Sequence, residues 1–231
     1  YRAMLDTRMT YTCGYWKNAQ TLDEAQEAKL ELICKKIGLK AGDRVLDIGG
    51  GWGSFAGYAA EKYGASVVAI TISKEQAALG RELTAGLPVE IRVQDYRDVT
   101  DGPYDHIVSI GMFEHVGWQN YRAFMKKTHE LLSDNGLFLL HTIGNPHTVY
   151  SGEAWFHKYI FPNGMLPSVT QIGKSIEKLF IMEDWHNFGA DYDTTLMHWF
   201  KNFDSSLPKL ASEYDLRFYR MWIYYLLCMA G

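Results

Sequence analysis

Short apolar runs alternate with amphipathic stretches along most of this chain. The runs have the length of strands, whereas the stretches between them repeat their apolar positions with a helical period. Strands are expected at Arg44–Gly49, Ser66–Thr71, Val89–Gln94, His106–Gly111, Leu137–Ile143 and Phe180–Trp185, and helices at Leu22–Ile37, Ser54–Tyr63, Lys74–Thr84 and Gln119–Leu132. This alternation predicts an α/β fold with a mostly parallel, doubly wound sheet and helices on both faces.

Turn and capping residues mark some of the predicted boundaries. Ser73 followed by Gln76 is typical of a capping box that opens a helix. Asn135-Gly136 is expected to end one helix and to begin the fifth strand. These signals fix where the chain turns back toward the sheet.

The alternation stops after Ile143. The stretch from Asn145 to Val169 is rich in proline and aromatic residues and has no clear period, which predicts a long ordered loop of the kind that often forms a lid. A helical pattern returns from Asp191 onward. No linker or repeat divides the chain, so one domain over residues 1–231 is expected.

A glycine loop follows the first predicted strand. Gly49, Gly51 and Gly53 alternate between an apolar run and the start of a helix. A strand, a glycine turn and a helix N-terminus together are typical of a nucleotide-type cofactor site, although a simple tight turn has the same pattern.

The type of cofactor is indicated by the acid that follows the third strand. A nicotinamide site would place a carboxylate after the second strand, where Ile70 to Ser73 offer none. Asp95 after the third strand suits a hydrogen bond to an adenine amine, as in S-adenosylmethionine (SAM) sites. The alternative is that Asp95 only begins a turn.

Titratable residues follow the fourth and fifth strands. Glu114 and His115 come after the fourth strand, and His141 lies near the end of the fifth. Because ligands bind beyond the carboxyl ends of parallel strands, these groups are candidates for acid–base chemistry or for orienting a polar ligand. Ordinary edge groups with satisfied hydrogen bonds are the alternative.

Composition excludes several classes of protein. The net charge of −4 argues against a broad nucleic-acid surface. No apolar run is long enough to span a bilayer, and no signal peptide opens the chain. Three widely spaced cysteines suit a reducing cytoplasm rather than a disulfide framework, and no His/Cys spacing predicts a metal site.

Aromatic residues gather near the start of the chain and in the stretch after Ile143. They could line an apolar channel or stabilise a cation, but core packing is the more common use of such rings. Cys228, within a helical apolar run, is expected to be a small buried core residue rather than a nucleophile. The chain begins at Tyr1 without methionine and stops just after that run, so a piece of a longer protein is expected.

Together these segments resemble the cyclopropane-fatty-acyl-phospholipid synthase family of SAM-dependent methyltransferases, to which the mycolic acid cyclopropane synthases are related. The matching pieces are MTYTCGYWKNAQTLDEAQEAKL, VLDIGGGWGS, TISKEQ, QDYRD, SIGMFEHVG, LLHTIG, YIFPNGMLPS and EDWHNFGADYDTTLMHW. The resemblance implies a class I, Rossmann-like methyltransferase fold. It also implies that the family's N-terminal domain and last strand lie outside this sequence. The sequence differs from the family's usual DIGCGWG motif at one position, where Gly50 replaces the cysteine.

The resemblance also implies a set of site residues. Those expected to bind SAM, with S-adenosylhomocysteine (SAH) as product, are Tyr11, Thr12, Val45, Leu46, Asp47, Ile48, Gly49, Gly50, Gly51, Trp52, Gly53, Thr71, Ile72, Ser73, Lys74, Glu75, Gln76, Asp95, Tyr96 and Arg97. Those expected at the catalytic centre, where the family holds bicarbonate, are Cys13, Glu114, His141, the Ile143 backbone and Tyr192, together with Cys228.

By resemblance the reaction is methylene transfer from SAM to the cis double bond of an acyl chain in a phospholipid, with bicarbonate as the base. A cytoplasmic enzyme that associates peripherally with the inner membrane surface, as a homodimer, is expected. Three alternatives stay open: N-methylation of a small amine, olefin methylation that leaves a branched chain, and a non-catalytic lipid- or nucleotide-binding module.

Overall fold

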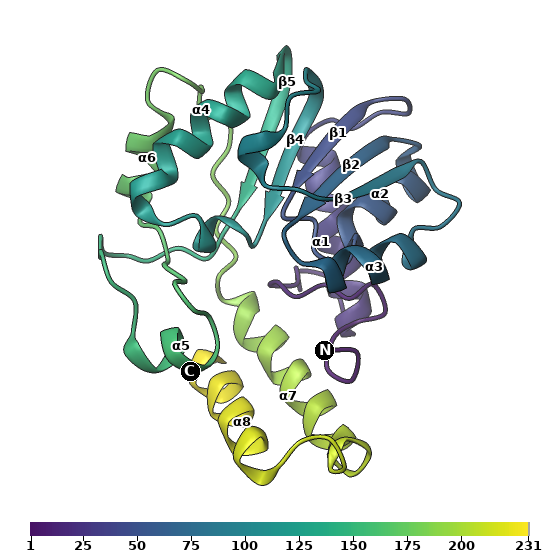
Figure 1. Cartoon of the computed structure of the whole chain (residues 1–231), viewed down its shortest axis with the longest axis vertical. Coiled ribbons are helices and arrows are strands. Elements are labelled where there is room, and N and C mark those ends of the chain that lie inside the picture. Colours follow the sequence, from purple (N-terminus) through teal and green to yellow (C-terminus); the bar gives the residue numbers. More distant parts are fainter. Residues whose placement is uncertain (231) are drawn as a thin grey trace. The chain divides into compact units, whose positions relative to one another are not determined.

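The computed structural model describes residues 1–230, and the chain divides into two compact units (Figure 1). The sheet unit is Leu32–Trp185, and the terminal unit combines Tyr1–Glu31 with the residues from His186 onward. Helix α1 (Leu22–Lys36) begins in the terminal unit and ends in the sheet unit.

The sheet unit contains a five-stranded parallel sheet with the order β3-β2-β1-β4-β5. The strands are β1 (Arg44–Ile48), β2 (Ser66–Thr71), β3 (Val89–Val93), β4 (Tyr104–Ile110) and β5 (Leu132–His141). The predicted α/β class, the parallel pairing and the approximate places of these five strands are confirmed. The reversal of strand order at β1 makes the carboxyl edge of β1 and β4 the place where ligands of such sheets bind.

Both faces of the sheet are buried. Leu46, Ile48 and Val68 belong to a core cluster on the face that carries Phe124 of α4 (Tyr121–Leu131). The alternate residues of the same strands are equally buried: Val45 is 0 % and Val67 1 % exposed. Since successive strand residues face opposite sides, this burial requires cover on both faces, as predicted.

Helices of the sheet unit supply that cover. Helix α2 (Ser54–Tyr63) packs against β2, and α3 (Lys74–Leu83) packs against β3. Helix α4 packs against α6 (Val169–Ile176), and Figure 1 shows these two lying together on one side of the sheet. Helix α6 was not among the expected helices, although Ser168 and Gln171 form a complete capping box at its start.

Two predictions about strands are wrong. Phe180–Trp185 forms no strand: the segment has no ladder partner among residues 1–230, and Ile181 is 86 % exposed. Asn135-Gly136 lies inside β5, which already begins at Leu132. There a side chain at Gly136 would approach the Asp105 carbonyl oxygen within 2.6 Å, so glycine is required by close approach of the neighbouring strand rather than by a turn.

The stretch from Asn145 to Val169 is a long loop that contains one short helix, α5 (Ala154–Tyr159). The base of the loop is closed by a hydrogen bond from Asn145 N to Pro167 O (2.8 Å) and by one between the hydroxyls of Thr148 and Ser168 (2.7 Å). The two ends of the loop are therefore joined, and the long loop predicted after Ile143 is present.

The terminal unit is helical, as the pattern after Asp191 predicts. Helices α7 (Asp191–Leu210) and α8 (Leu216–Ala230) pack side by side (Figure 1). Phe203 of α7 stacks on Tyr219 of α8, with ring centroids 5.9 Å apart. Within residues 1–230, no helix has the length and apolar character that a bilayer crossing requires.

Candidate functional site

The glycine loop after β1 has the backbone that its sequence predicts. Gly49, Gly51 and Gly53 adopt φ values of 84°, 55° and 82°, a left-handed region that residues with a side chain rarely enter. The amides of Gly49 and Gly50 both donate to Ile70 O at 3.0 Å, which fixes the loop on the neighbouring strand. The alternation of glycines therefore forms an open turn at the start of α2.

Gly50, where the family usually has cysteine, lies under close neighbours. A Cβ at this position would be 2.8 Å from the Ala69 Cβ and 3.0 Å from Asp47 Oδ2. Asp47 is 2 % exposed, and its burial raises its pKa to about 7. Val45 and Leu46, also expected in the cofactor site, are completely buried, so their role is to support the loop from within the sheet.

The loop after β2 carries the next group of predicted cofactor residues. The Ser73 hydroxyl accepts from Gln76 N (3.2 Å), but the Gln76 side chain binds the Thr71 hydroxyl (2.8 Å) instead of completing the box. Only half of the predicted capping box forms. Ile72 is 81 % exposed at this carboxyl edge, which leaves an apolar surface open to a ligand.

Asp95 begins the short 3₁₀ turn Tyr96–Asp98 after β3. Its carboxylate accepts from Arg97 N (2.9 Å) and pairs with the Arg97 guanidinium (2.7 Å). These hydrogen bonds hold the pKa of Asp95 below its ordinary value. Asp95 therefore begins a turn, which was the alternative interpretation of this residue. Its hydrogen bond to the adenine of a cofactor stays a prediction.

Glu114 and His141 come from neighbouring strands. His141 ends β5 opposite Ile110 of β4, and its carbonyl accepts from Gly111 N (2.9 Å). Glu114 follows in the 3₁₀ turn Phe113–His115 and is 7 % exposed. The backbones of these two candidates therefore meet at one edge of the sheet, as predicted from strand order.

The two oxygens of the Glu114 carboxylate differ in their hydrogen bonding. Oε1 accepts from Ile143 N (2.8 Å), whereas Oε2 is buried and has no hydrogen-bond partner among residues 1–230. Burial raises the pKa of Glu114, and the bond from Ile143 lowers it by a smaller amount. Since a buried polar atom without a partner is costly, Oε2 is a candidate ligand-binding atom.

The Ile143 backbone does not present a free donor. Its N–H is used by Glu114, and its carbonyl accepts from the Thr142 hydroxyl (3.2 Å). Ile143 N–H thus orients the carboxylate of Glu114. The expectation that the Ile143 backbone helps to hold an anion stays a prediction.

In the terminal unit, Cys13 lies in a segment fixed by α7. Gly14 N donates to the Thr195 hydroxyl (3.0 Å), and Trp16 N donates to Asp191 Oδ2 (2.7 Å). Cys13 is 6 % exposed, and burial raises the pKa of its thiol to about 12. A raised pKa favours the thiol form over the thiolate. The expected place of Cys13 at the catalytic centre stays a prediction.

Thr12 is held by α1. Gln26 Nε2 donates to the Thr12 carbonyl (2.8 Å), and Lys29 Nζ donates to the Thr12 hydroxyl (2.5 Å). Gln26 and Lys29 are 0 % and 1 % exposed. Sequence reasoning missed both, because polar residues on a helix are normally solvated and nothing local marks these as buried.

The two tyrosines predicted in this unit pack on one tryptophan. Trp199 is fully buried, and its ring lies 5.1 Å from the ring of Tyr11 and 5.9 Å from that of Tyr192, centroid to centroid. The Tyr11 hydroxyl donates to the Tyr225 hydroxyl at 2.9 Å. Burial raises the pKa of Tyr11 well above its ordinary value, so the ring is a neutral, electron-rich surface.

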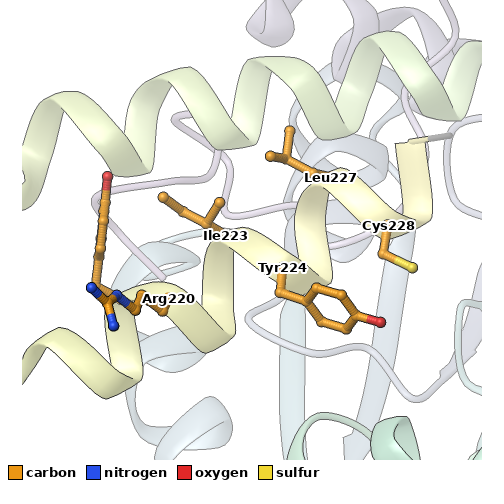
Figure 2. Close-up of a pocket in the computed structure, with 6 residues that line it drawn as sticks. Arg220, Ile223, Tyr224, Leu227 and Cys228 are labelled. Carbon is orange, nitrogen blue, oxygen red and sulfur yellow. The ribbon is translucent and has the colours of Figure 1, made fainter.

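Cys228 is not a buried core residue. It is exposed on α8 and lines an apolar groove of about 540 Å³ together with Ile223, Tyr224 and Leu227 (Figure 2). The prediction of burial is wrong because α8 turns this face away from its packing against α7.

Comparison with known proteins gives the family of the chain. The sequence model described as mycolic acid cyclopropane synthetase matches residues 1–231. Cyclopropane-fatty-acyl-phospholipid synthase of Escherichia coli is 54 % identical over 231 residues, which cover 100 % of this chain and 60 % of that protein. The chain thus spans about three fifths of the length of this curated relative.

Solved structures agree on the fold. A mycolic acid cyclopropane synthase bound to SAH and CTAB matches with a TM-score of 0.90 and 32 % identity, over 99 % of this chain and 87 % of that one. Coclaurine N-methyltransferase, bound to N-methylheliamine and SAH, matches with a TM-score of 0.84 and 26 % identity, over 100 % of this chain and 74 % of that one. The fold is that of class I SAM-dependent methyltransferases, and the chain belongs to the mycolic acid cyclopropane synthetase family.

Proposed function

We propose that this chain is the catalytic part of an enzyme that transfers a methylene group from SAM to the cis double bond of an unsaturated acyl chain in a phospholipid. The proposal brings to this chain the activity named for its relative from Escherichia coli. The single observation that carries it beyond similarity is the buried Glu114 carboxylate with its unused Oε2.

The residues at the carboxyl edge of the sheet fit SAM. Three glycines with positive φ leave the loop after β1 without side chains, so a ligand can approach its backbone and the N-terminus of α2. The exposed Ile72 supplies an apolar surface for a flat base. Bound SAM would supply an electrophilic methyl group.

A small oxyanion fits Glu114. Its Oε2 is buried and unused, and its raised pKa allows the carboxyl group to carry a proton at that oxygen. A protonated Oε2 donates to an oxyanion, and an ionised one accepts from the hydroxyl of bicarbonate. Bicarbonate would supply the base, and Cys13, His141 and Tyr192 are expected by resemblance to serve the same reaction.

The protein must do three things for this reaction. An alkene is a poor nucleophile, so the acyl chain must be held in line with the methyl group. The alkyl cation left by methyl transfer must be shielded from water near electron-rich groups, for which rings such as Tyr11 and Tyr192 are suited. A proton then leaves the new methyl group as the ring closes, and Glu114 keeps the acceptor of that proton in place.

The surroundings of the enzyme follow from the substrate. Phospholipid acyl chains are met at a membrane surface, so we infer a cytoplasmic enzyme that binds the inner surface peripherally. From the family resemblance we also propose that it acts as a homodimer, that the two compact units form one catalytic domain, and that an N-terminal domain and a last strand belong to the whole protein.

A product analysis tests the function. The purified protein is incubated with SAM carrying a trideuterated methyl group and with vesicles of unsaturated phosphatidylethanolamine, and the released acyl chains are examined by mass spectrometry. Cyclopropanation retains two of the three deuterons, because one leaves as the ring closes. Unchanged acyl chains would refute the proposal, and an open chain with a methylene or methyl branch would instead support the olefin methyltransferase.

N-methylation of a small amine is the second candidate, favoured by the similarity to coclaurine N-methyltransferase. Such a reaction needs a base for an ammonium proton but no oxyanion in an apolar surrounding. A parallel incubation with small secondary amines separates the two candidate functions. Only the phospholipid or only the amine should take up deuterium from the labelled SAM.

A further inference from the structure

Lys29 is a fully buried lysine in the middle of α1, and the proposed chemistry gives it no role. It is 1 % exposed, a rare state for a lysine. Burial lowers the pKa of its ammonium to about 7, although attraction to the Asp6 carboxylate acts in the opposite direction. Because an apolar residue would avoid this cost, the contacts of the ammonium group need an explanation.

Those contacts converge on one residue. Lys29 Nζ donates to the Thr12 hydroxyl (2.5 Å) and to Gln26 Oε1 (2.8 Å), and Gln26 Nε2 donates to the Thr12 carbonyl (2.8 Å). Two side chains one helical turn apart thus hold both the backbone and the side chain of Thr12.

The direction of the bond determines what the hydroxyl can do. Below pH 7 Lys29 carries its proton, and an ammonium group only donates, so Thr12 Oγ1 then accepts from Lys29 and turns its own hydrogen elsewhere. Within residues 1–230, that hydroxyl forms no other hydrogen bond. Thr12 is half-buried, so its hydroxyl hydrogen is available to a ligand.

We propose that Lys29 is a positioning residue that fixes the Thr12 hydroxyl as a hydrogen-bond donor to an acceptor atom of the bound cofactor. The inference rests on the proposed function, in which SAM is bound, and on the family resemblance, which implies that Thr12 contacts it. A purely structural role for Lys29 has a different consequence: it would affect folding whether or not position 12 carries a hydroxyl.

A double-mutant cycle on SAH binding separates the two roles. SAH affinity of the purified protein is measured by calorimetry for wild type, Lys29→Met, Thr12→Val and the double variant. We expect each single change to weaken binding about tenfold, the value of one lost hydrogen bond, and the double variant to bind no more weakly than Thr12→Val. Losses that simply add would overturn the proposal.

Matched variants control the cycle. Thr12→Ser keeps the hydroxyl and should bind SAH like wild type, and Lys29→Met should still weaken binding in that background. Lys35→Met removes an exposed lysine from the same helix and should leave the affinity unchanged. If Lys29→Met does not fold, Lys29→Gln replaces it in the same cycle, since its shorter neutral side chain also removes the ammonium from Thr12.

The outcomes distinguish this proposal from the function on which it rests. A protein that binds SAH with the expected coupling but forms no cyclopropane refutes the function and retains the role of Lys29. A protein that forms cyclopropane without the coupling refutes only the role of Lys29. Absence of SAH binding by wild type would overturn both.

Discussion

Glu114 and Lys29 are both buried ionisable side chains, but their surroundings treat them in opposite ways. Glu114 in the sheet unit keeps one oxygen without a partner among residues 1–230, whereas the Lys29 ammonium in the terminal unit donates to two oxygens. A buried polar atom without a hydrogen-bond partner is a candidate for ligand binding, whereas a buried group that is hydrogen-bonded within the protein can fix the residue it contacts. This difference is the basis for proposing that Glu114 touches a reactant and that Lys29 positions Thr12.

The largest expected effect comes from Glu114→Gln. The amide oxygen can still accept from Ile143 N, so the fold is preserved, while the unused oxygen becomes an NH₂ group that can no longer accept or ionise. Turnover should fall by about 10²–10⁴-fold with SAH affinity unchanged. Glu130→Gln, on an exposed face of α4, is the control. Turnover at the wild-type level in Glu114→Gln would remove this residue from the chemistry.

Lys29 should make stability depend on pH. Its pKa is about 7 in the folded protein against an ordinary 10.5, so the unfolded chain binds more protons between these values. The free energy of unfolding should therefore rise as pH rises from 7 to 10.5, by at most about 5 kcal/mol. Urea unfolding of wild type and Lys29→Met across this range isolates the slope, which should vanish in the variant. If the free energy of unfolding changes equally with pH in both proteins, the lowered pKa of Lys29 is contradicted.

Asp47 should show the opposite slope. Its pKa is about 7 in the folded protein against an ordinary 3.8, so the folded protein binds more protons between these values. The free energy of unfolding should fall as pH rises from 3.8 to 7, by at most about 4 kcal/mol. Measured without cofactor, Asp47→Asn should flatten this part of the curve. A variant that loses stability as steeply as wild type would show that another group titrates there.

The smallest effect is expected at Gly50. Introducing the cysteine that is usual in the family places Cβ against Ala69, and such overpacking costs about 1–3 kcal/mol. Gly50→Cys should lower the urea midpoint, and adding Ala69→Gly should restore it. If the second change brings no recovery, the strain comes from Asp47 Oδ2 instead.

Sequence reasoning succeeded where local pattern decides the structure. The alternating glycines predict the turn after β1 because each needs a positive φ, and strand order brings Glu114 and His141 to one edge. It failed where a distant segment decides. The burial of Lys29 depends on the chain around Thr12, and the exposure of Cys228 depends on which face of α8 meets α7. Neither the burial of Lys29 nor the exposure of Cys228 can be predicted from the residues next to it in the sequence.

Glu114 also joins the two ends of the long loop. Its side chain accepts from Ile143 N (2.8 Å), and its carbonyl accepts from Met165 N (2.7 Å). The segment between Ile143 and Met165 can therefore gain, lose or exchange residues while the Glu114 carboxylate keeps its place. The reason is that the entropic cost of closing a loop rises only slowly with loop length. Under the proposed function, this segment can change in sequence while the carboxylate that we propose as the oxyanion ligand stays in place.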